Sequence, residues 1–152
     1  MKKTDNFINK LNTCTLICFF VFFNFCLSIV LNILSKKMFN NSFTENTHVF
    51  SSFKEEFFVI AIFSPLIETV IFQYIVIEIL YDKFKKEIIC IVSAFLFSLI
   101  HLYNLIYFIF SFIIGLTFAY LYLIGRLKKR GFLYVYSTHL IYNVIVIILK
   151  HI

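Results

Sequence analysis

The sequence predicts an all-α membrane protein, a polytopic bundle of about five transmembrane helices. Of its 152 residues, 61% are hydrophobic and only 14% are charged, and the mean hydropathy is +0.92. A chain this short has too little interior to bury so much apolar surface in water. The apolar residues also come in long blocks, which is typical of membrane-spanning segments and not of amphipathic helices.

The first apolar block runs from about Cys14 to Leu34 and follows a basic start. It is longer than the apolar core of a signal peptide, and no small-x-small cleavage site follows it, so we expect a retained helix. A polar segment from Ser35 to Glu56 reads as a loop. We therefore divide the chain into residues 1–56, an N-terminal helix and outside loop, and residues 57–149, a second domain.

Four more helices are expected after this loop. The second spans Phe57 to Leu80 and ends at a charged turn, and the stretch from Ile88 to Ile124 contains no acidic or basic residue except His101. As a single helix that stretch would be about 55 Å long, well beyond a bilayer core of about 30 Å. It must form two helices, with a break near Tyr103–Asn104. A basic turn then leads to the last helix, about Phe132 to Leu149.

The basic residues between the helices predict the orientation. With the N-terminus in the cytoplasm, inside segments hold ten of the 14 Lys and Arg residues and outside segments hold four. Because inside loops carry an excess of Lys and Arg, we expect a multi-pass protein of the cell membrane with a cytoplasmic N-terminus. The bias also accounts for the net charge of +6 without a nucleic-acid partner. The ten inside residues are Lys2, Lys3, Lys10, Lys83, Lys85, Lys86, Arg126, Lys128, Lys129 and Arg130.

A few polar residues lie within the apolar helices, where ionisable side chains are costly and are therefore candidates for function. Glu68 is near the middle of the second helix, His101 is in the third, and His139 is in the fifth. Asn143 follows His139 by one helical turn, so both point the same way. A buried carboxylate can take a proton from water, imidazoles can hold or protonate reacting groups, and an amide can donate to an oxyanion. Glu78 lies in the same helix as Glu68, near its cytoplasmic end and off the face that carries Glu68, so we expect Glu78→Gln to be nearly silent.

Other functions use similar residues. Two histidines and a glutamate could hold zinc with an open position, although the compact His-Glu-x-x-His pattern is absent. A membrane glutamate can also serve a proton relay or a small transporter. The estimated depths of these residues in the membrane do not agree. Counting the rise per residue from the inside turns places Glu68 and His101 about 18–20 Å into the membrane, but His139 only about 10 Å. Spacing alone leaves protease, metal site and transporter open.

The segments Ser64–Gln73, Phe97–His101 and His139–Asn143 follow one another in order, each in an apolar stretch. They resemble three motifs of the CPBP family, the CAAX-protease and bacteriocin-processing membrane peptidases. Those motifs read Glu-Glu-x-x-x-Arg, usually after a Pro, then Phe-x-x-x-His, then His-x-x-x-Asn. The stretch Gly115–Tyr122 also resembles the fourth-helix segment of the family. The resemblance covers about Phe57 to Leu149.

The resemblance implies an intramembrane endopeptidase of the glutamic type, with no metal or other cofactor. Glu68 would activate a water, His101 and His139 would act as acid and binding groups, and Asn143 would stabilise the oxyanion. The implied substrate is a peptide or membrane protein at the lipid bilayer, in bacteriocin or signal-peptide processing or in self-immunity. The supporting motif positions are Thr69, Phe72, Gln73 and Phe97.

Two positions depart from the family motif. Thr69 stands where the family has its second Glu, and Gln73 stands where it has Arg. Both charges are lost together, which costs less than losing one of a pair, but Thr and Gln can offer only neutral hydrogen bonds instead. The departures leave an alternative, a degenerate and non-catalytic immunity or scaffold protein that binds a peptide or a membrane partner.

Overall fold

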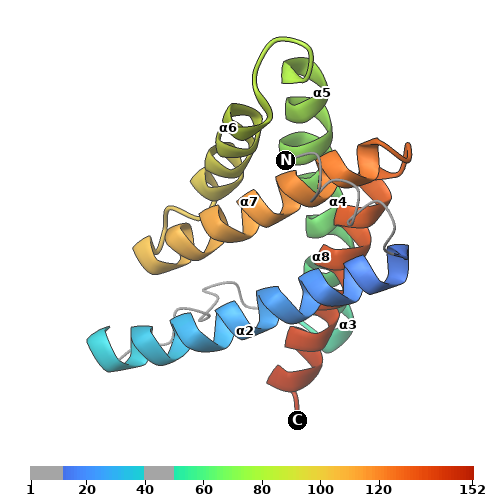
Figure 1. Ribbon diagram of the computed structural model, residues 1–152. Helices are drawn as coiled ribbons and strands as arrows, with labels where there is room; N and C mark the ends of the chain where they lie inside the picture. The colour runs from blue at the N-terminus through green and yellow to red at the C-terminus, as the bar shows by residue number, and fades with distance from the viewer. Residues whose placement is uncertain (1–11, 40–49) are drawn as a thin grey trace.

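The computed structural model describes residues 12–39 and 50–152, and the ordered elements in those ranges are all helical (Figure 1). The prediction of an all-α bundle is therefore confirmed. Lys2, Lys3 and Lys10, which entered the orientation argument, lie outside the described residues, as does part of the predicted loop. The elements are α2 (Thr13–Phe39), α3 (Phe53–Glu56), η1 (Phe57–Phe63), α4 (Ser64–Glu68), η2 (Thr69–Ile75), α5 (Val76–Leu80), α6 (Lys86–Leu99), α7 (Leu105–Arg126) and α8 (Gly131–Lys150).

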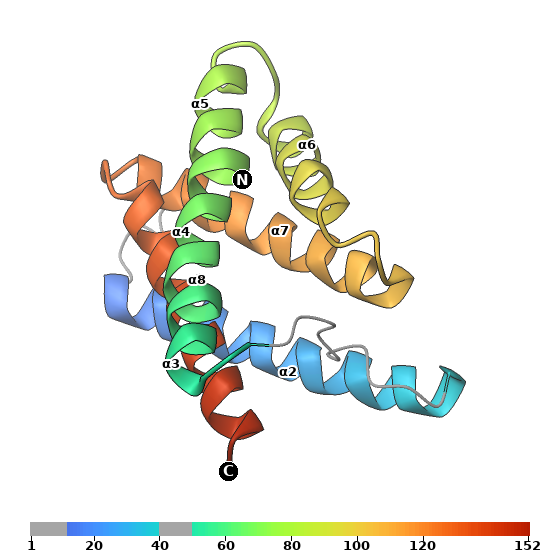
Figure 2. The same cartoon turned by 180° about the vertical axis from the view of Figure 1, so that it is seen from behind.

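The elements from α3 to α5 form one continuous helix from Phe53 to Leu80, which Figure 2 shows as a single column. It begins four residues earlier than expected, because the Ser52 side chain caps it by accepting the N–H of Glu55. Its backbone widens to a π-helix in η1 and again in η2. Such widened turns are rare and often lie at functional sites. The candidate residue Glu68 lies between the two.

Within residues 12–39 and 50–152, four helices are long and apolar enough to cross a membrane, namely Thr13–Lys37, Phe53–Leu80, Leu105–Arg126 and Gly131–Lys150. The remaining helix, α6, has 14 residues. At about 21 Å it is shorter than the hydrocarbon core. The five-helix expectation thus resolves into four full-length helices and one short one.

The break predicted near Tyr103–Asn104 is confirmed. Asn104 is the N-cap of α7, and its side-chain oxygen accepts the N–H groups of Ile106 and Tyr107. The sequence predicted His101 inside a helix, but the structure places it in the turn that follows α6.

Helix α7 is the centre of the packing, since α6, α8 and α2 all contact it. Gly115 lets α6 approach closely, because a Cβ at this position would lie 2.9 Å from the Ala94 Cα. That approach brings Phe97, near the end of α6, and the following turn against α7. Helix α2 packs on α7 and α8. The division of the chain at residue 56 stays a prediction.

One end of the bundle, which we call the basic end, joins the segments predicted to be inside. Glu78 of α5 accepts hydrogen bonds from the Arg126 Nε at 2.9 Å and from the Tyr122 hydroxyl at 2.8 Å. Thr13, at the start of α2, shares a 2.7 Å hydrogen bond with Tyr134 in the first turn of α8. Glu78 therefore links α5 to α7. Because of these contacts, Glu78→Gln cannot serve as the nearly silent change that the sequence predicted.

The opposite end of the bundle, the far end, joins the start of α3 to the end of α8. The buried Glu56 carboxylate accepts from the Lys150 Nζ at 2.6 Å and pairs with the His151 Nε2 at 2.8 Å. Figure 1 shows the C-terminus here, away from the turn between α5 and α6. The two ends are thus held by separate sets of charged contacts.

Candidate active site

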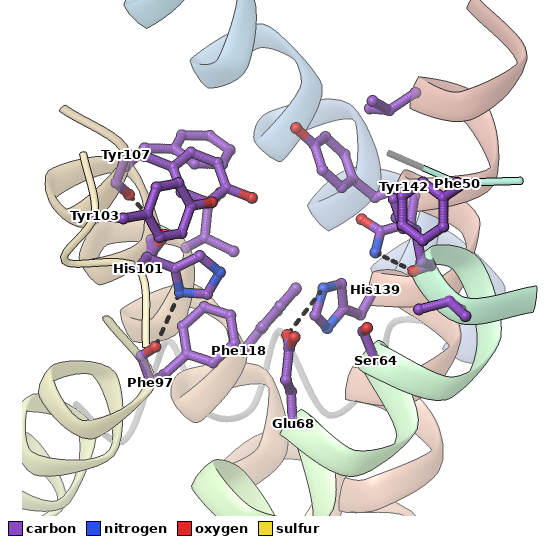
Figure 3. Close-up of a pocket in the computed structure, with 17 residues that line it drawn as sticks. Phe50, Ser64, Glu68, Phe97, His101, Tyr103, Tyr107, Phe118, His139 and Tyr142 are labelled. Atoms are coloured by element: carbon purple, nitrogen blue, oxygen red, sulfur yellow. Dashed lines mark hydrogen bonds and ion pairs between the residues drawn. The ribbon is translucent and has the colours of Figure 1, made fainter. Parts of the chain in front are cut away.

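A cavity of about 370 Å³ lies among the second helix, the α6–α7 turn, α7 and α8 (Figure 3). Glu68, His101, His139 and Asn143 all line it, so the structure brings the four predicted site residues together. The rest of the wall is mostly aromatic and aliphatic. These residues are Phe50, Val59, Ile60, Ser64, Phe97, Tyr103, Tyr107, Phe110, Ser111, Ile114, Phe118, Tyr142 and Val146.

Glu68 and His139 face one another at the floor of the cavity. The His139 Nε2 lies 3.7 Å from the Glu68 Oε2, and the two side chains are 9% and 18% exposed. This separation is too long for a good direct hydrogen bond, but it leaves both groups able to contact the same small polar molecule. The His139 Nδ1 is buried and has no hydrogen-bond partner among the described residues. The Phe118 ring, 4.9 Å away between centroids, packs against the imidazole.

His101 is fixed by the backbone of its own chain segment. Its Nδ1 lies 3.2 Å from the Phe97 carbonyl oxygen. Because a carbonyl only accepts, Nδ1 carries the proton, and Nε2 of the neutral ring is left as an acceptor. The Tyr107 ring packs edge-on at 4.8 Å. Figure 3 shows the other edge of the His101 ring turned toward the cavity.

Phe97, the first residue of the second motif, separates the two imidazoles. Its ring centroid lies 5.3 Å from that of His101 and 6.1 Å from that of His139. The ring also meets Phe72 of the second helix edge-on, at 6.0 Å. The Phe72 carbonyl in turn accepts the Ser93 hydroxyl of α6 at 2.7 Å. Both supporting phenylalanines therefore set the position of α6 against the second helix.

The ion pair between Glu78 and Arg126 explains the depth discrepancy. It puts the end of α7 level with Glu78, so the following turn lies deeper than the turn after α5. From Glu78 to Glu68 the helix rises about 15 Å, and from Gly131 to His139 it rises about 12 Å. Counting each helix from its own turn had assumed that the two turns were level.

The Asn143 side chain binds a backbone carbonyl of the second helix, one turn before the first motif. Its Nδ2 donates to the Ile60 carbonyl oxygen at 2.8 Å. In this π-helical register the Ser64 N–H bonds to the Val59 carbonyl, five residues back. The next donor in that register would be Pro65, which has no N–H, and so the Ile60 carbonyl needs another partner. One N–H of the Asn143 amide is used here, and the second remains for the predicted oxyanion.

We expect Asn143→Ala to lower the free energy of unfolding by about 1–3 kcal/mol, because it leaves the Ile60 carbonyl unpaired. Pro65→Ala would restore a backbone N–H that can bond to that carbonyl. The double variant should therefore lose less stability than the two single variants together, with a coupling of about 0.5–3 kcal/mol. Unfolding of the purified protein in detergent measures this, and additive losses would contradict the proposed link.

The two departures from the family motif lie away from the cavity. Thr69 and Gln73 are fully buried, and neither lines it. Within residues 12–39 and 50–152, the Thr69 hydroxyl oxygen and both polar atoms of the Gln73 amide have no hydrogen-bond partner. Their positions show that the departures alter the packing behind Glu68 and not the set of groups that faces the cavity.

Three tyrosines of the site were missed by sequence reasoning. Tyr103 and Tyr107 lie on the cavity wall beside His101, with their rings 5.7 Å apart, and Tyr142 lies on the α8 side. The available signal was weak, because tyrosines are common at membrane interfaces for reasons unrelated to catalysis.

The chain matches the family described as Type II CAAX prenyl endopeptidase Rce1-like over residues 51–145. This region is more than half of the sequence. It contains Glu68, His101, His139 and Asn143 and leaves α2 outside. No curated protein and no solved structure matches the chain.

Proposed function

This chain belongs to the Rce1-like family of type II CAAX prenyl endopeptidases, a family of intramembrane proteases, and we propose that Glu68 activates the water that cleaves its substrate. The observation that carries the proposal is the approach of the His139 Nε2 to the Glu68 carboxylate, at 3.7 Å, on the floor of an apolar cavity. A carboxylate out of bulk water is a suitable general base. The imidazole beside it can hold the carboxylate and the water in position.

The reaction begins when Glu68 takes a proton from a water while the water oxygen bonds to the carbonyl carbon of the peptide. The electron pair of the carbonyl moves onto its oxygen. When this intermediate collapses, the C–N bond breaks, and Glu68 passes the proton to the departing nitrogen. The products are a carboxyl group and an amine, and one water is consumed.

The neighbouring groups have separate roles in this scheme. His139 holds Glu68 and the water, and the His101 Nε2 accepts a hydrogen bond from the water or from the departing amine. The second N–H of the Asn143 amide donates to the developing oxyanion. The Asn143 side chain is anchored on the Ile60 carbonyl, so that N–H has a fixed direction. A fixed donor is more effective than one that must reorient during the reaction.

The biological setting that we favour is bacteriocin processing, signal-peptide processing or self-immunity. The second candidate is a non-catalytic immunity or scaffold protein. Thr69 and Gln73 favour this second candidate. They replace the charged pair of the family motif, and their buried polar atoms have no hydrogen-bond partner among the described residues. The set of residues facing the cavity supports the peptidase, because it contains all four motif groups in spite of those departures.

We expect a metal chelator to leave peptide processing unchanged, because the proposed water is activated by a carboxylate. In the described part of the chain, no three His, Cys, Asp or Glu side chains lie close enough to hold a metal ion together. The test measures processing by the purified protein before and after treatment with a chelator. A loss that added zinc restores would replace the glutamate mechanism with a metal-based one.

A further inference from the structure

A second cavity, of about 460 Å³, lies at the basic end of the bundle and shares no lining residue with the candidate active site. It is formed by the second helix, the end of α7 and the first turn of α8. Three cationic side chains line it, those of Arg126, Lys129 and Arg130, against the single carboxylate of Glu78. The wall of this cavity therefore carries an excess of positive charge.

The Glu78 carboxylate is already neutralised within this wall. The Arg126 guanidinium donates to it twice, from Nε at 2.9 Å and from Nη2 at 3.1 Å, and the Tyr122 hydroxyl donates to it at 2.8 Å. Lys129 and Arg130 are both exposed, and neither pairs with a carboxylate in residues 12–39 and 50–152. The excess charge of the cavity is therefore carried by these two side chains.

The backbone adds further hydrogen-bond donors beside these side chains. The first N–H groups of a helix have no acceptor within the helix. The first three residues of α8, namely Gly131, Phe132 and Leu133, all line the cavity, and the N-cap residue Arg130 provides no side-chain cap for them. The start of a helix also carries a partial positive charge, which favours an anion. Cationic side chains and backbone donors thus converge on one cavity.

The turn between α7 and α8 holds Lys129 in a conformation that favours glycine. The Arg130 N–H donates to the Gly125 carbonyl oxygen at 2.9 Å. The Lys129 N–H donates to the Arg126 carbonyl oxygen, also at 2.9 Å. These two bonds form a Schellman motif, whose left-handed residue is usually glycine. Lys129 occupies that position with a φ of 55°. Glycine would suit the backbone better here, so the lysine side chain contributes something other than the stability of the turn.

The cavity lies where a lipid headgroup can reach it. Arg126 is the last residue of one candidate membrane span and Gly131 is the first residue of the next, so the turn between them lies at a bilayer surface. Figure 1 shows this turn at the outer edge of the bundle. Leu127 and Leu133 flank its basic residues and are 57% and 55% exposed. Exposed apolar side chains beside basic ones are suited to the boundary between headgroups and acyl chains.

We propose that this cavity binds the phosphate of an anionic phospholipid headgroup. The phosphate oxygens accept hydrogen bonds from the Lys129 ammonium, the Arg130 guanidinium and the N–H groups at the start of α8. Basic cavities between transmembrane helices are suited to such headgroups. An anionic lipid is preferred over a zwitterionic one, because the lining carboxylate of Glu78 is already paired and does not receive an ammonium group.

Native mass spectrometry of the purified protein in a non-ionic detergent tests this site. The dissociation constant of the first bound lipid is measured for phosphatidylglycerol and for phosphatidylcholine, with and without an equal concentration of inorganic phosphate. Lys129→Gly removes one charge and gives the turn its preferred residue. Arg130→Asn removes another charge and supplies a side chain that can cap α8. Both variants should unfold at a temperature no lower than that of the wild type, so weaker binding would not result from misfolding.

Lys83→Gly is the matched control, because it removes a lysine from an exposed turn outside the cavity. We expect phosphatidylglycerol to bind at least about fivefold more tightly than phosphatidylcholine. Lys129→Gly and Arg130→Asn should each weaken its binding by about fivefold, the change expected for one basic residue near an anionic lipid. Lys83→Gly should leave the binding unchanged, as should Glu68→Gln, because the measurement needs no catalysis.

Free phosphate should not displace the lipid, because it lacks the acyl chains that contact the apolar side chains beside the turn. Equal binding of the two lipids would overturn the proposal, as would an equal weakening by Lys83→Gly. Displacement of phosphatidylglycerol by the equal concentration of inorganic phosphate would identify the ligand as a free anion and would overturn the assignment to a lipid.

Discussion

Replacing Glu68 with Gln is expected to lower peptide processing by about 10²- to 10⁴-fold while the protein remains folded and inserted. The amide keeps the size of the side chain and part of its hydrogen bonding, but it cannot take a proton from water. The loss corresponds to about 3–5 kcal/mol of transition-state stabilisation. The measurement is the rate of peptide processing, or the level of bacteriocin resistance, at wild-type abundance.

Glu87→Gln is the matched control for this change. Glu87 is an exposed residue in the first turn of α6, outside the cavity, and its replacement should leave processing unchanged. Full activity of the Glu68→Gln variant would show that Glu68 is not the base. In that case the non-catalytic binding function would become the better account.

His139→Ala is expected to cause a loss of similar size, about 10²- to 10⁴-fold. This change removes the imidazole that faces the Glu68 carboxylate at 3.7 Å. It also removes a ring that packs on Phe118, so the abundance of the inserted protein must be measured together with the processing rate.

His151→Ala provides the same chemical change at the far end. His151 pairs with Glu56 at that end of the bundle. When the His151 imidazole is removed, Lys150 still pairs with Glu56. Processing should therefore stay near the wild-type rate. An equal loss in both variants would show that the effect of His139→Ala is structural and not catalytic.

The helices and their connections could largely be predicted from the sequence, because the membrane requires long apolar segments with satisfied backbones. Asn104 marked the break before α7, since a side chain of this kind caps a helix. Spacing also placed His139 and Asn143 on one face of α8, and both line the cavity. The catalytic roles of these residues stay predictions.

The missed features depend on relations between helices. The pairing of Glu78 with Arg126 sets the level of the last turn, and nothing in either segment alone reveals it. The bond from Asn143 to the Ile60 carbonyl requires the π-helical register ahead of Pro65. A helical period of 3.6 residues cannot predict such a register. The sequence predicted the break before α7 but not that α6 already ends at Leu99, which leaves His101 in the turn.

The most direct test of the central claim is mass spectrometry of apolar peptides incubated with the purified protein in lipid vesicles, in water enriched in ¹⁸O. We expect pairs of fragments whose combined mass equals that of the peptide plus one water, with ¹⁸O in the new carboxyl group. The Glu68→Gln protein should produce none. Peptides that bind to both proteins and remain uncut would contradict the peptidase function and identify the chain as a binding protein.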